Sequence, residues 1–291
     1  MRFITFLSIV SMLISCKTNQ ESEVENQVPS RVLSNEFKEY WFNGQAEITS
    51  YSLEQERYGE IRTGTAVLIF VTEDFLPDVQ VKANIKTETT QSVLKLNKTK
   101  NFNTGIYPYS IMSSVFYPLE EKNHALKVTH SIQEWCGHVY AQLNNRNDFE
   151  IKSHSYFEGE ADQEYNLTKT HLEDEIWTQI RVDPSDLPVG EIEIIPSMEF
   201  SRLRHKEFKA YKAIASLEEI ESSFEYSINY PELDRTLTIW FESASPYHIT
   251  KWTEQIGESM TQATFMKKIQ SAYWSKNQNK DAYLRDSLQL N

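Results

Sequence analysis

Apolar and polar residues alternate with a period of two over much of the chain, which is typical of half-buried antiparallel strands. The clearest run is 224–230, where the aromatic and aliphatic residues occupy every second position. A second alternating run, 236–241, follows the turn residues 231–234, so the pattern predicts a hairpin with one face exposed to solvent. A second hairpin is predicted at 137–144 and 149–157, because the polar residues between them favour a turn.

The run from Ala66 to Val71 is apolar at consecutive positions. A strand with this pattern is buried on both faces, so we expect it at the centre of the sheet, covered on each side and paired with 46–57. Further strands are predicted at 78–86, 92–100, 124–135, 190–200, 207–217 and 262–273.

Three segments have the spacing of amphipathic helices. A capping-box pattern at 170–173 precedes apolar residues spaced by four. In the second segment, Ser245 is the expected N-cap, Pro246 the first helical residue and Gly257 the end, with a stripe of Ile249, Trp252 and Ile256. The third is 279–288. Each apolar stripe needs a partner surface, so we expect these helices to cover a sheet.

The elements together predict one mainly β domain over 35–291. It is an antiparallel sheet, half-barrel or sandwich-like, with a few short covering helices. A half-barrel or concave sheet, like those of lipoprotein carriers, is favoured over a two-sheet sandwich, because the helices need a sheet face to cover.

The N-terminus has the pattern of a secretory signal peptide over 1–15. Arg2 precedes an apolar run that is too short to span a bilayer. The residues 13–16 resemble a bacterial lipobox, which implies that Cys16 becomes the first residue and carries lipid chains that anchor the protein stably. The alternative is ordinary cleavage near Ser15, which leaves a soluble periplasmic protein.

The residue after Cys16 is Lys17 rather than Asp, which by the lipoprotein resemblance implies the outer membrane, with the domain on its periplasmic or surface face. Residues 16–34 are polar and lack aromatics, so we expect a lipidated, flexible tether. The membrane partner is then lipid, contacted through acylated Cys16.

The composition is acidic, with 29 Lys and Arg against 42 Asp and Glu and a formal net charge of −13. This excludes a basic nucleic-acid footprint. The second of the two cysteines is Cys136. If Cys16 is lipidated, no disulfide can form within the chain, and the core must be stable without one.

The sequence lacks a Gly-rich phosphate loop, a His-Glu-x-x-His motif, a nucleophile elbow and paired metal-binding cysteines, so no cofactor or metal is expected. One group could carry chemistry. In an extended strand Glu134, Cys136 and His138 share a face, and His138 could lower the pKa of the thiol. His130 and His154 are expected on neighbouring strands and could join this group. The group would then form the nucleophile site of a cysteine hydrolase or a metal site. The competing interpretation is a buried, structural Cys136 in a strand bulge.

Two aromatic runs next to Asn and Gly are candidate binding surfaces. They contain Trp41 in 39–44, and Phe102, Tyr107 and Tyr109 in 101–109. Such side chains can stack on a sugar or lipid, or they can anchor the core. An acidic run at 158–162 fits a solvated turn better than a calcium loop. The favoured function is therefore a non-catalytic binding or scaffolding module for an envelope protein, glycan or lipid; the alternative is the hydrolase or metal-binding protein.

The runs 69–75, 101–109 and 271–274 resemble uncharacterised lipoproteins of the Bacteroidota over nearly the full mature chain. Some of these carry the label "septum formation inhibitor Maf". The Maf nucleotide pyrophosphatases have an N-terminal Ser-x-Ser-Pro-Arg-Arg motif, whereas Ser245-Pro246 is followed here by Tyr247. The resemblance implies an envelope lipoprotein, and no Maf catalytic residue is assigned.

Overall fold

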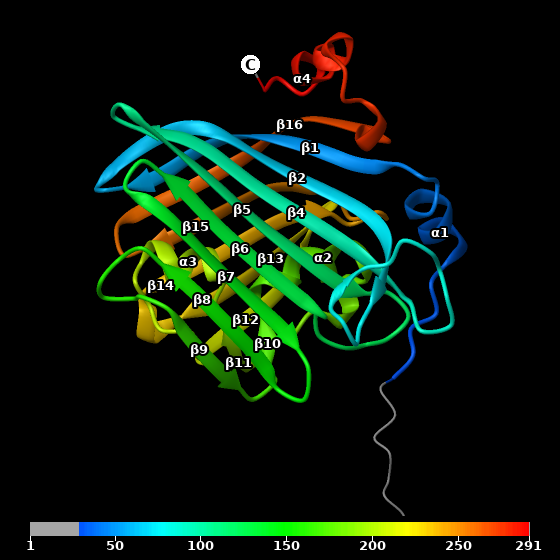
Figure 1. Ribbon diagram of the computed structural model, residues 1–291, viewed down its shortest axis with the longest axis horizontal. Helices are drawn as coiled ribbons and strands as arrows, with labels where there is room; N and C mark the ends of the chain where they lie inside the picture. Colours follow the sequence, from blue (N-terminus) through cyan, green and yellow to red (C-terminus); the bar gives the residue numbers. More distant parts are fainter. Residues whose placement is uncertain (1–28, 291) are drawn as a thin grey trace, which may run out of the picture.

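The structure, a computed structural model, describes residues 29–290. One continuous sheet dominates it, in the strand order β10-β11-β12-β13-β14-β15-β16-β1-β2-β4-β5-β6-β7-β8-β9, with β3 paired to β2. Its neighbouring strands are antiparallel, apart from the parallel pair β10 and β11. Because β10 and β9 end the order, the sheet is not closed (Figure 1). The predicted mainly antiparallel β class is confirmed.

The strands are β1 (Ala46–Arg57), β2 (Glu60–Leu76), β3 (Val81–Lys82), β4 (Gln91–Thr104), β5 (Tyr107–Pro118), β6 (Lys127–Glu134), β7 (Gly137–Asn145), β8 (Phe149–Ser155), β9 (Gln163–Leu167), β10 (His171–Leu172), β11 (Gly190–Ile195), β12 (Tyr211–Ile220), β13 (Ser223–Tyr230), β14 (Arg235–Glu242), β15 (Ile249–Ile256) and β16 (Ser259–Ser271). The α-helices are α1 (Asn35–Trp41), α2 (Glu173–Val182), α3 (Met198–Leu203) and α4 (Tyr283–Ser287). Short 3₁₀ turns lie at Pro184–Asp186, Pro231–Leu233, Tyr273–Ser275 and Asn279–Ala282.

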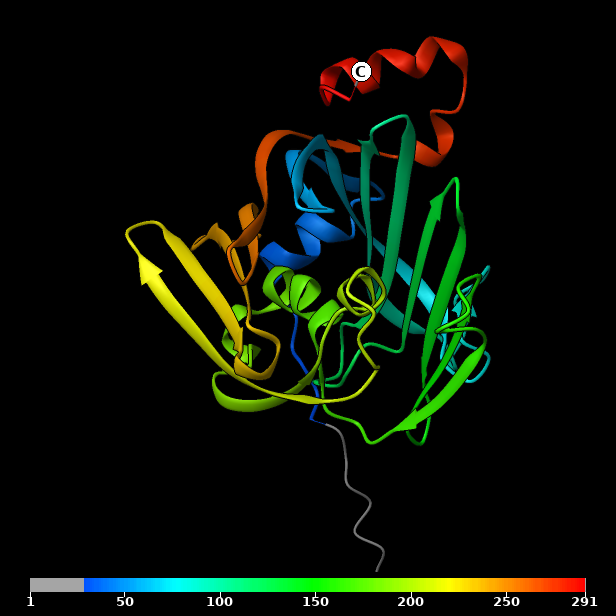
Figure 2. The ribbon, with the colours of Figure 1, turned by 90° about the vertical axis from the view of Figure 1, so that its left-hand side faces the viewer.

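The sheet curves around its helices. Figure 2 shows α2 and α3 between the two arms of the sheet. Their apolar side chains, including Ile176, Ile180 and Phe200, join the main core together with Phe37 and Trp41 of α1. The concave side of this barrel-like sheet is therefore largely filled by helices.

The central position predicted for 66–71 is confirmed within β2. Ala66, Leu68 and Phe70 face the main core. Val67 and Val71 face outward and pack in a separate cluster with Leu288. The C-terminal segment with α4 thus covers the outer face of β2, and the helices cover its inner face (Figure 1).

Both predicted hairpins are present, as β13 with β14 and β7 with β8. The helix predicted after residue 170 is also present, but Leu172 is its N-cap, and Glu175 rather than Glu173 accepts a hydrogen bond from the Leu172 N–H, at 3.2 Å. The carboxylate of Glu173 instead binds Arg235. A long-range ion pair has replaced the local capping bond.

The helix predicted at 246–257 is wrong, because this segment forms β15 between β14 and β16. The spacing of its apolar residues has a different cause. The pairing register shifts where Trp240 opposes Lys251 and Phe241 opposes Ile249, so one extra residue of β15 is inserted. Such a bulge changes the alternation of the strand, and Ile249 and Trp252 are both buried despite their three-residue spacing.

Other predicted boundaries also differ. The strand predicted at 190–200 ends at Ile195, and α3 follows after Ser197, whose Oγ accepts the Phe200 N–H at 3.2 Å. Of 78–86, only Val81–Lys82 forms a strand; 78–80 belong to a turn and 84–85 to a bend. The helix predicted at 279–288 is a 3₁₀ turn followed by α4. The strands predicted at 92–100, 124–135, 207–217 and 262–273 are β4, β6, β12 and β16 with shifted ends.

The predicted signal peptide and Cys16 lie outside the described residues. Residues 29–34, expected to be part of the tether, contact the domain. Arg31 is mostly buried, and its guanidinium donates to the Asp186 carboxylate at 3.2 Å and to the backbone oxygen of Pro118 at 3.1 Å. These contacts attach residues 29–34 to the domain.

Candidate functional site

A cavity opens where the sheet fails to close. We call this place the seam: β9, at one edge of the sheet, lies beside residues 205–208, which precede β12. The rings of Tyr165 and Phe208 meet there with centroids 5.6 Å apart and nearly perpendicular planes. The seam cavity has a volume of about 440 Å³ and is lined by β6 to β9, residues 159–160, α3 and the turn after it. This volume lies within the range of small-molecule sites.

One wall of the seam cavity is apolar. Val139 and Ala141 project from the inner face of β7, because residues at alternate positions of a strand share a face. Tyr165 and Phe208 add aromatic surface from the two sides of the seam. An apolar group can therefore be buried here.

Three buried polar side chains also line the seam cavity. His130, Ser201 and Arg202 are 1%, 2% and 9% exposed. Among residues 29–290, His130 Nε2, Ser201 Oγ and Arg202 Nε have no hydrogen-bond partner. Buried polar atoms are nearly always paired. These three atoms have almost no accessible surface, so they lie within the wall of the seam cavity and do not open onto it.

His130 owes its position to the alternation of β6. Val128, His130 and Ile132 share the inner face of the strand. On the adjacent strand β5, Ser113 pairs with His130, and Ser113 Oγ lies 2.9 Å from His130 Nδ1. This fixes the ring, so that Nε2 is its free nitrogen.

The imidazole of His130 is uncharged near neutral pH. Burial lowers its pKa to about 4, and the positive charges of Lys98 and Arg202 act in the same direction. The nearby carboxylate of Glu199 acts in the opposite direction but does not cancel them. His130 is therefore a neutral hydrogen-bonding group, and burial is the main cause.

Arg202 is held at the mouth of the seam cavity by Glu160. One of its terminal nitrogens donates to Glu160 Oε1 at 3.3 Å, and its guanidinium lies over the ring of Phe157, 4.3 Å from the centroid. His205 Nδ1 lies 2.6 Å from the same oxygen, and Ser155 donates to the other at 2.6 Å. Glu160 thus orients Arg202 while leaving Arg202 Nε free.

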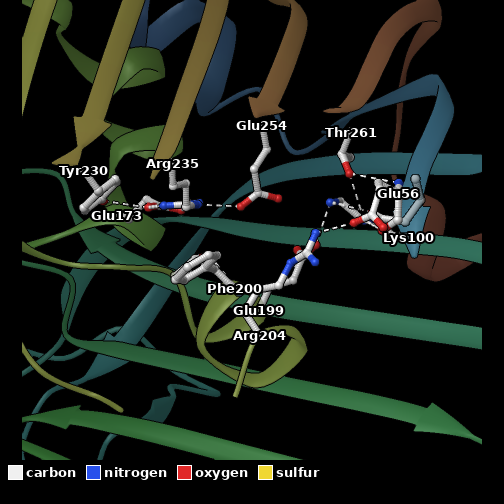
Figure 3. A network of polar contacts seen from close by, with 12 residues as sticks. Glu56, Lys100, Glu173, Glu199, Phe200, Arg204, Tyr230, Arg235, Glu254 and Thr261 are labelled. Carbon is white, nitrogen blue, oxygen red and sulfur yellow. Dashed lines mark hydrogen bonds and ion pairs between the residues drawn. The ribbon is translucent and has the colours of Figure 1, made fainter. Parts of the chain in front are cut away.

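A buried network of charged side chains connects α3 to the sheet (Figure 3). Glu199 lies between two lysines: its Oε1 is 2.6 Å from Lys100 Nζ, and its Oε2 is 3.3 Å from Lys98 Nζ. Burial alone would raise the pKa of Glu199, but the two lysines together hold it well below its ordinary value. The carboxylates of Asp174 and Glu173 also act on Lys98, so Glu199 is not the only acidic group that balances the two lysines.

A second part of the network connects α2 to the sheet. Figure 3 shows Arg235 of β14 between Glu173 and Glu254. Its Nη2 donates to Glu173 at 2.7 Å, and its Nε donates to Glu254 at 2.6 Å. The ring of Phe200 on α3 lies under the same guanidinium, at 4.2 Å. These contacts fix both helices relative to the strands.

Asp174 holds the start of α3. Its carboxylate accepts the Met198 N–H at 3.0 Å. Burial raises the pKa of Asp174 to about 6. The position of Ser201 and Arg202 therefore depends on a side chain that titrates in the mildly acidic range.

Cys136 and His138 lie elsewhere. Cys136 is exposed in the turn between β6 and β7, so Glu134, Cys136 and His138 are not consecutive members of one strand face. The Cys136 N–H donates to the Glu134 carboxylate at 2.6 Å, and hydrogen bonding by Glu134 to the thiol raises the pKa of Cys136. The predicted effect of His138 was the reverse.

The histidines of the predicted metal or nucleophile site are also separated. His130 faces the interior, whereas His138 and His154 are exposed on the outer face of β7 and β8. Within residues 29–290, no group of three or more His, Cys, Asp or Glu is placed to hold a metal ion. The structure does not bring these candidates together.

The aromatic candidates are largely built into the core. Trp41 is 1% exposed and contacts Phe70, with ring centroids 6.0 Å apart. Phe102 and Tyr109 are buried and stack on each other at 5.0 Å. Tyr107 is half-buried, and its ring centroid lies 6.4 Å from that of the exposed Trp135. Of the two interpretations, the contacts of Trp41, Phe102 and Tyr109 favour core anchoring.

The hydrogen-bonded pair of Ser113 and His130 invites comparison with a catalytic dyad. Ser113 is 1% exposed and is not part of the wall of the seam cavity. A nucleophile must reach the reacting atom of a bound substrate. The pair is therefore not placed for catalysis through Ser113.

Comparisons with known proteins add a fold-level likeness. No protein-family model matches the chain, and no curated protein matches it significantly. A solved β-barrel-like protein of a domain of unknown function, DUF1849, from Brucella abortus is similar over 78% of this chain and 98% of that one, with 7% identity and a TM-score of 0.48.

None of the helices described within residues 29–290 has the length and apolar character needed to cross a membrane.

Proposed function

We propose that this chain is a lipid-anchored envelope protein whose domain binds a small ligand in the seam cavity without catalysing a reaction. The observation that carries the proposal is the seam cavity of about 440 Å³, in which the apolar side chains of Val139 and Phe208 lie beside the polar side chains of Ser153 and Arg202. An apolar wall beside a few converging polar groups is the usual composition of a small-molecule site.

The anchoring part of the proposal is supported by the sequence. The apolar leader and the lipobox-like residues before Cys16 favour lipidation, and Lys17 favours the outer membrane. Metabolic labelling with a clickable fatty acid tests this directly. We expect the label on the wild-type chain and its loss in Cys16→Ser; an unlabelled wild-type chain would contradict lipidation.

Native mass spectrometry of the full chain, purified from the cells that make it, tests the binding function. We expect a fraction of the protein to carry a small molecule whose mass is released on denaturation. Ser153→Phe places a ring inside the seam cavity, since Ser153 lines it, and should abolish the adduct.

The matched control is His154→Phe, which adds the same ring at the neighbouring position of β8. His154 lies on the outer face and its side chain is 57% exposed, so this variant should retain the adduct. An adduct that persists in Ser153→Phe, or a wild-type chain free of any adduct, would contradict binding in the seam cavity.

A further inference from the structure

We infer that the seam is a gate through which a ligand enters the seam cavity, and that the carboxylate of Glu160 holds this gate closed. The moving part is the segment 156–167, which contains the turn after β8 and β9 itself; we call it the flap. The inference rests on the proposed binding function and extends it to the way in which the seam cavity is entered.

The flap is joined to the rest of the sheet along one edge. β9 pairs with β8 and ends the strand order. Among the residues that the structure describes, no backbone hydrogen bond joins the flap to α3 or to residues 204–208 across the seam. Segments with few such bonds open at a lower free-energy cost than strands inside a ladder. Side chains alone therefore close this side of the flap.

The polar contacts across the seam converge on Glu160. Its Oε1 lies 3.3 Å from a terminal nitrogen of Arg202 and 2.6 Å from His205 Nδ1. Its Oε2 accepts a hydrogen bond from Ser155 Oγ at 2.6 Å, on its own side of the seam. Ser155 thus fixes the carboxylate so that the other oxygen faces α3. Removing this one carboxylate removes both polar contacts at once.

The apolar contacts across the seam are few. The rings of Tyr165 and Phe208 meet edge to face at 5.6 Å, and the ring of Phe157 lies 4.3 Å from the guanidinium of Arg202. Tyr165, Phe208 and Arg202 all line the seam cavity. Separating the flap from α3 therefore opens the cavity directly to solvent.

The other walls of the seam cavity are fixed. β6, β7 and β8 are joined by continuous antiparallel pairing. On the far side of the seam, α3 is held by the ion pair of Glu199 with Lys100, and the Lys206 N–H donates to the Ser201 oxygen at 2.8 Å. The flap is consequently the part of the wall that can move while the rest stays in place.

The two ends of the flap differ. Its C-terminal end continues into β10, where Thr170 Oγ1 donates to the Glu193 oxygen at 2.7 Å. At the other end Ala161, next to Glu160, has a φ of 51°, a left-handed conformation that residues with a Cβ rarely adopt. Such a conformation persists where surrounding contacts impose it. The flap can thus swing about its end at β10 once Glu160 is released, as lids do in other binding sites.

Thiol labelling inside the seam cavity tests the gate without a ligand. Ser153 lines the cavity and is 7% exposed, so Ser153→Cys places a thiol there in a full chain that also carries Cys16→Ser and Cys136→Ser. We expect methyl methanethiosulfonate to modify it at least tenfold more slowly than the exposed Cys136 of the Cys16→Ser chain, as measured by intact mass. Glu160→Gln should speed the modification at least threefold. Arg202→Met, which removes the partner on the other side of the seam, should act in the same direction.

The matched control is Glu164→Gln, the same change on the same flap. Glu164 pairs with Lys152 of β8 at 3.1 Å, so this contact does not cross the seam, and the variant should leave the rate unchanged. A second control replaces Ser153→Cys by Ser50→Cys, in β1. Ser50 is 0% exposed and does not line the seam cavity, so its thiol reports unfolding of the whole domain and should respond less to Glu160→Gln.

Equal rates in Glu160→Gln and Glu164→Gln would overturn the inference, and so would an acceleration that Ser50→Cys shares in full. Modification of Ser153→Cys as fast as that of Cys136 would show a seam that stands open, which also overturns it. In each of these cases the adduct seen or not seen by native mass spectrometry decides the proposed binding function independently.

Discussion

Arg181 of α2 and Glu47 of β1 form a bidentate ion pair inside the protein, with N–H···O distances of 2.6 and 2.8 Å and neither side chain exposed. The pair joins the helix that fills the sheet to one of its central strands. Burial alone would raise the pKa of Glu47, but Arg181 holds it down at about 2. Both groups are therefore charged in the folded state over the whole physiological pH range.

Arg181→Met should lower the free energy of unfolding by about 3–5 kcal/mol, because it leaves the Glu47 carboxylate buried without its cation. The double variant Arg181→Met with Glu47→Leu should recover much of this loss. Urea denaturation gives both values. As a control, Lys152→Met removes an exposed pair with Glu164 and should change stability by less than about 1 kcal/mol. Equal effects of Arg181→Met and Lys152→Met would contradict the buried pair.

Asp174 should make stability fall as the pH rises. Its pKa of about 6 in the folded state lies above its ordinary value of 3.8, so the folded state binds a proton more tightly than the unfolded state between these values. The stabilising contribution of the protonated form is complete below about pH 4 and is lost as the pH passes 6.

Asp174→Asn cannot ionise and still offers an oxygen to the Met198 N–H. Relative to the wild type, it should therefore gain about 2–3 kcal/mol more at pH 7.5 than at pH 4. Urea denaturation at the two pH values measures the difference. A stability difference that does not depend on pH would show that Asp174 titrates as an ordinary carboxyl.

Cys136 should behave as an accessible but unactivated thiol. The folded chain carrying Cys16→Ser should react with a disulfide reagent without denaturant, at a rate that rises with pH well above neutrality, since hydrogen bonding by Glu134 raises the pKa of Cys136. Glu134→Gln should speed the reaction at pH 7.5. Fast labelling below pH 7 that is lost in His138→Ala would instead favour the cysteine hydrolase.

Leu288 should hold the C-terminal segment against the sheet. Its side chain is 5% exposed and packs with Val67 and Val71. Leu288→Ala should weaken this contact by about 2 kcal/mol and raise local opening accordingly. We expect trypsin to cleave after Arg285 at least tenfold faster. Tyr283→Ala, in the same C-terminal segment but 58% exposed, is the control and should leave the rate unchanged.

The elements that could be predicted from the sequence are those set by local pattern. The run 66–71 is apolar on both faces, and that alone indicated a strand covered on two sides. β15 could not be predicted, because the spacing of Ile249 and Trp252 comes from a bulge opposite Phe241, and so from a partner strand remote from any local signal. α3 is only six residues long, too short to show a helical period.

The residues of the candidate site could be predicted from the sequence only in part. The alternation of Val128, His130 and Ile132 could have placed His130 on a buried face. The position of His130 on a strand next to that of Cys136 favoured a shared reactive group instead. Ser201 and Arg202 could not be assigned without α3, and their meeting with His130 depends on how the sheet curves around its helices.

The most direct test of the seam cavity is nitrogen NMR of the imidazole rings, with ¹⁵N-labelled histidine in the full chain carrying Cys16→Ser. The Nε2 resonance of His130 is assigned by its absence in His130→Gln. Unfolding and refolding the chain, which removes a copurified ligand, should move this resonance and leave those of His138 and His154, on the outer face, in place. A His130 resonance that is the same before and after refolding would contradict the site.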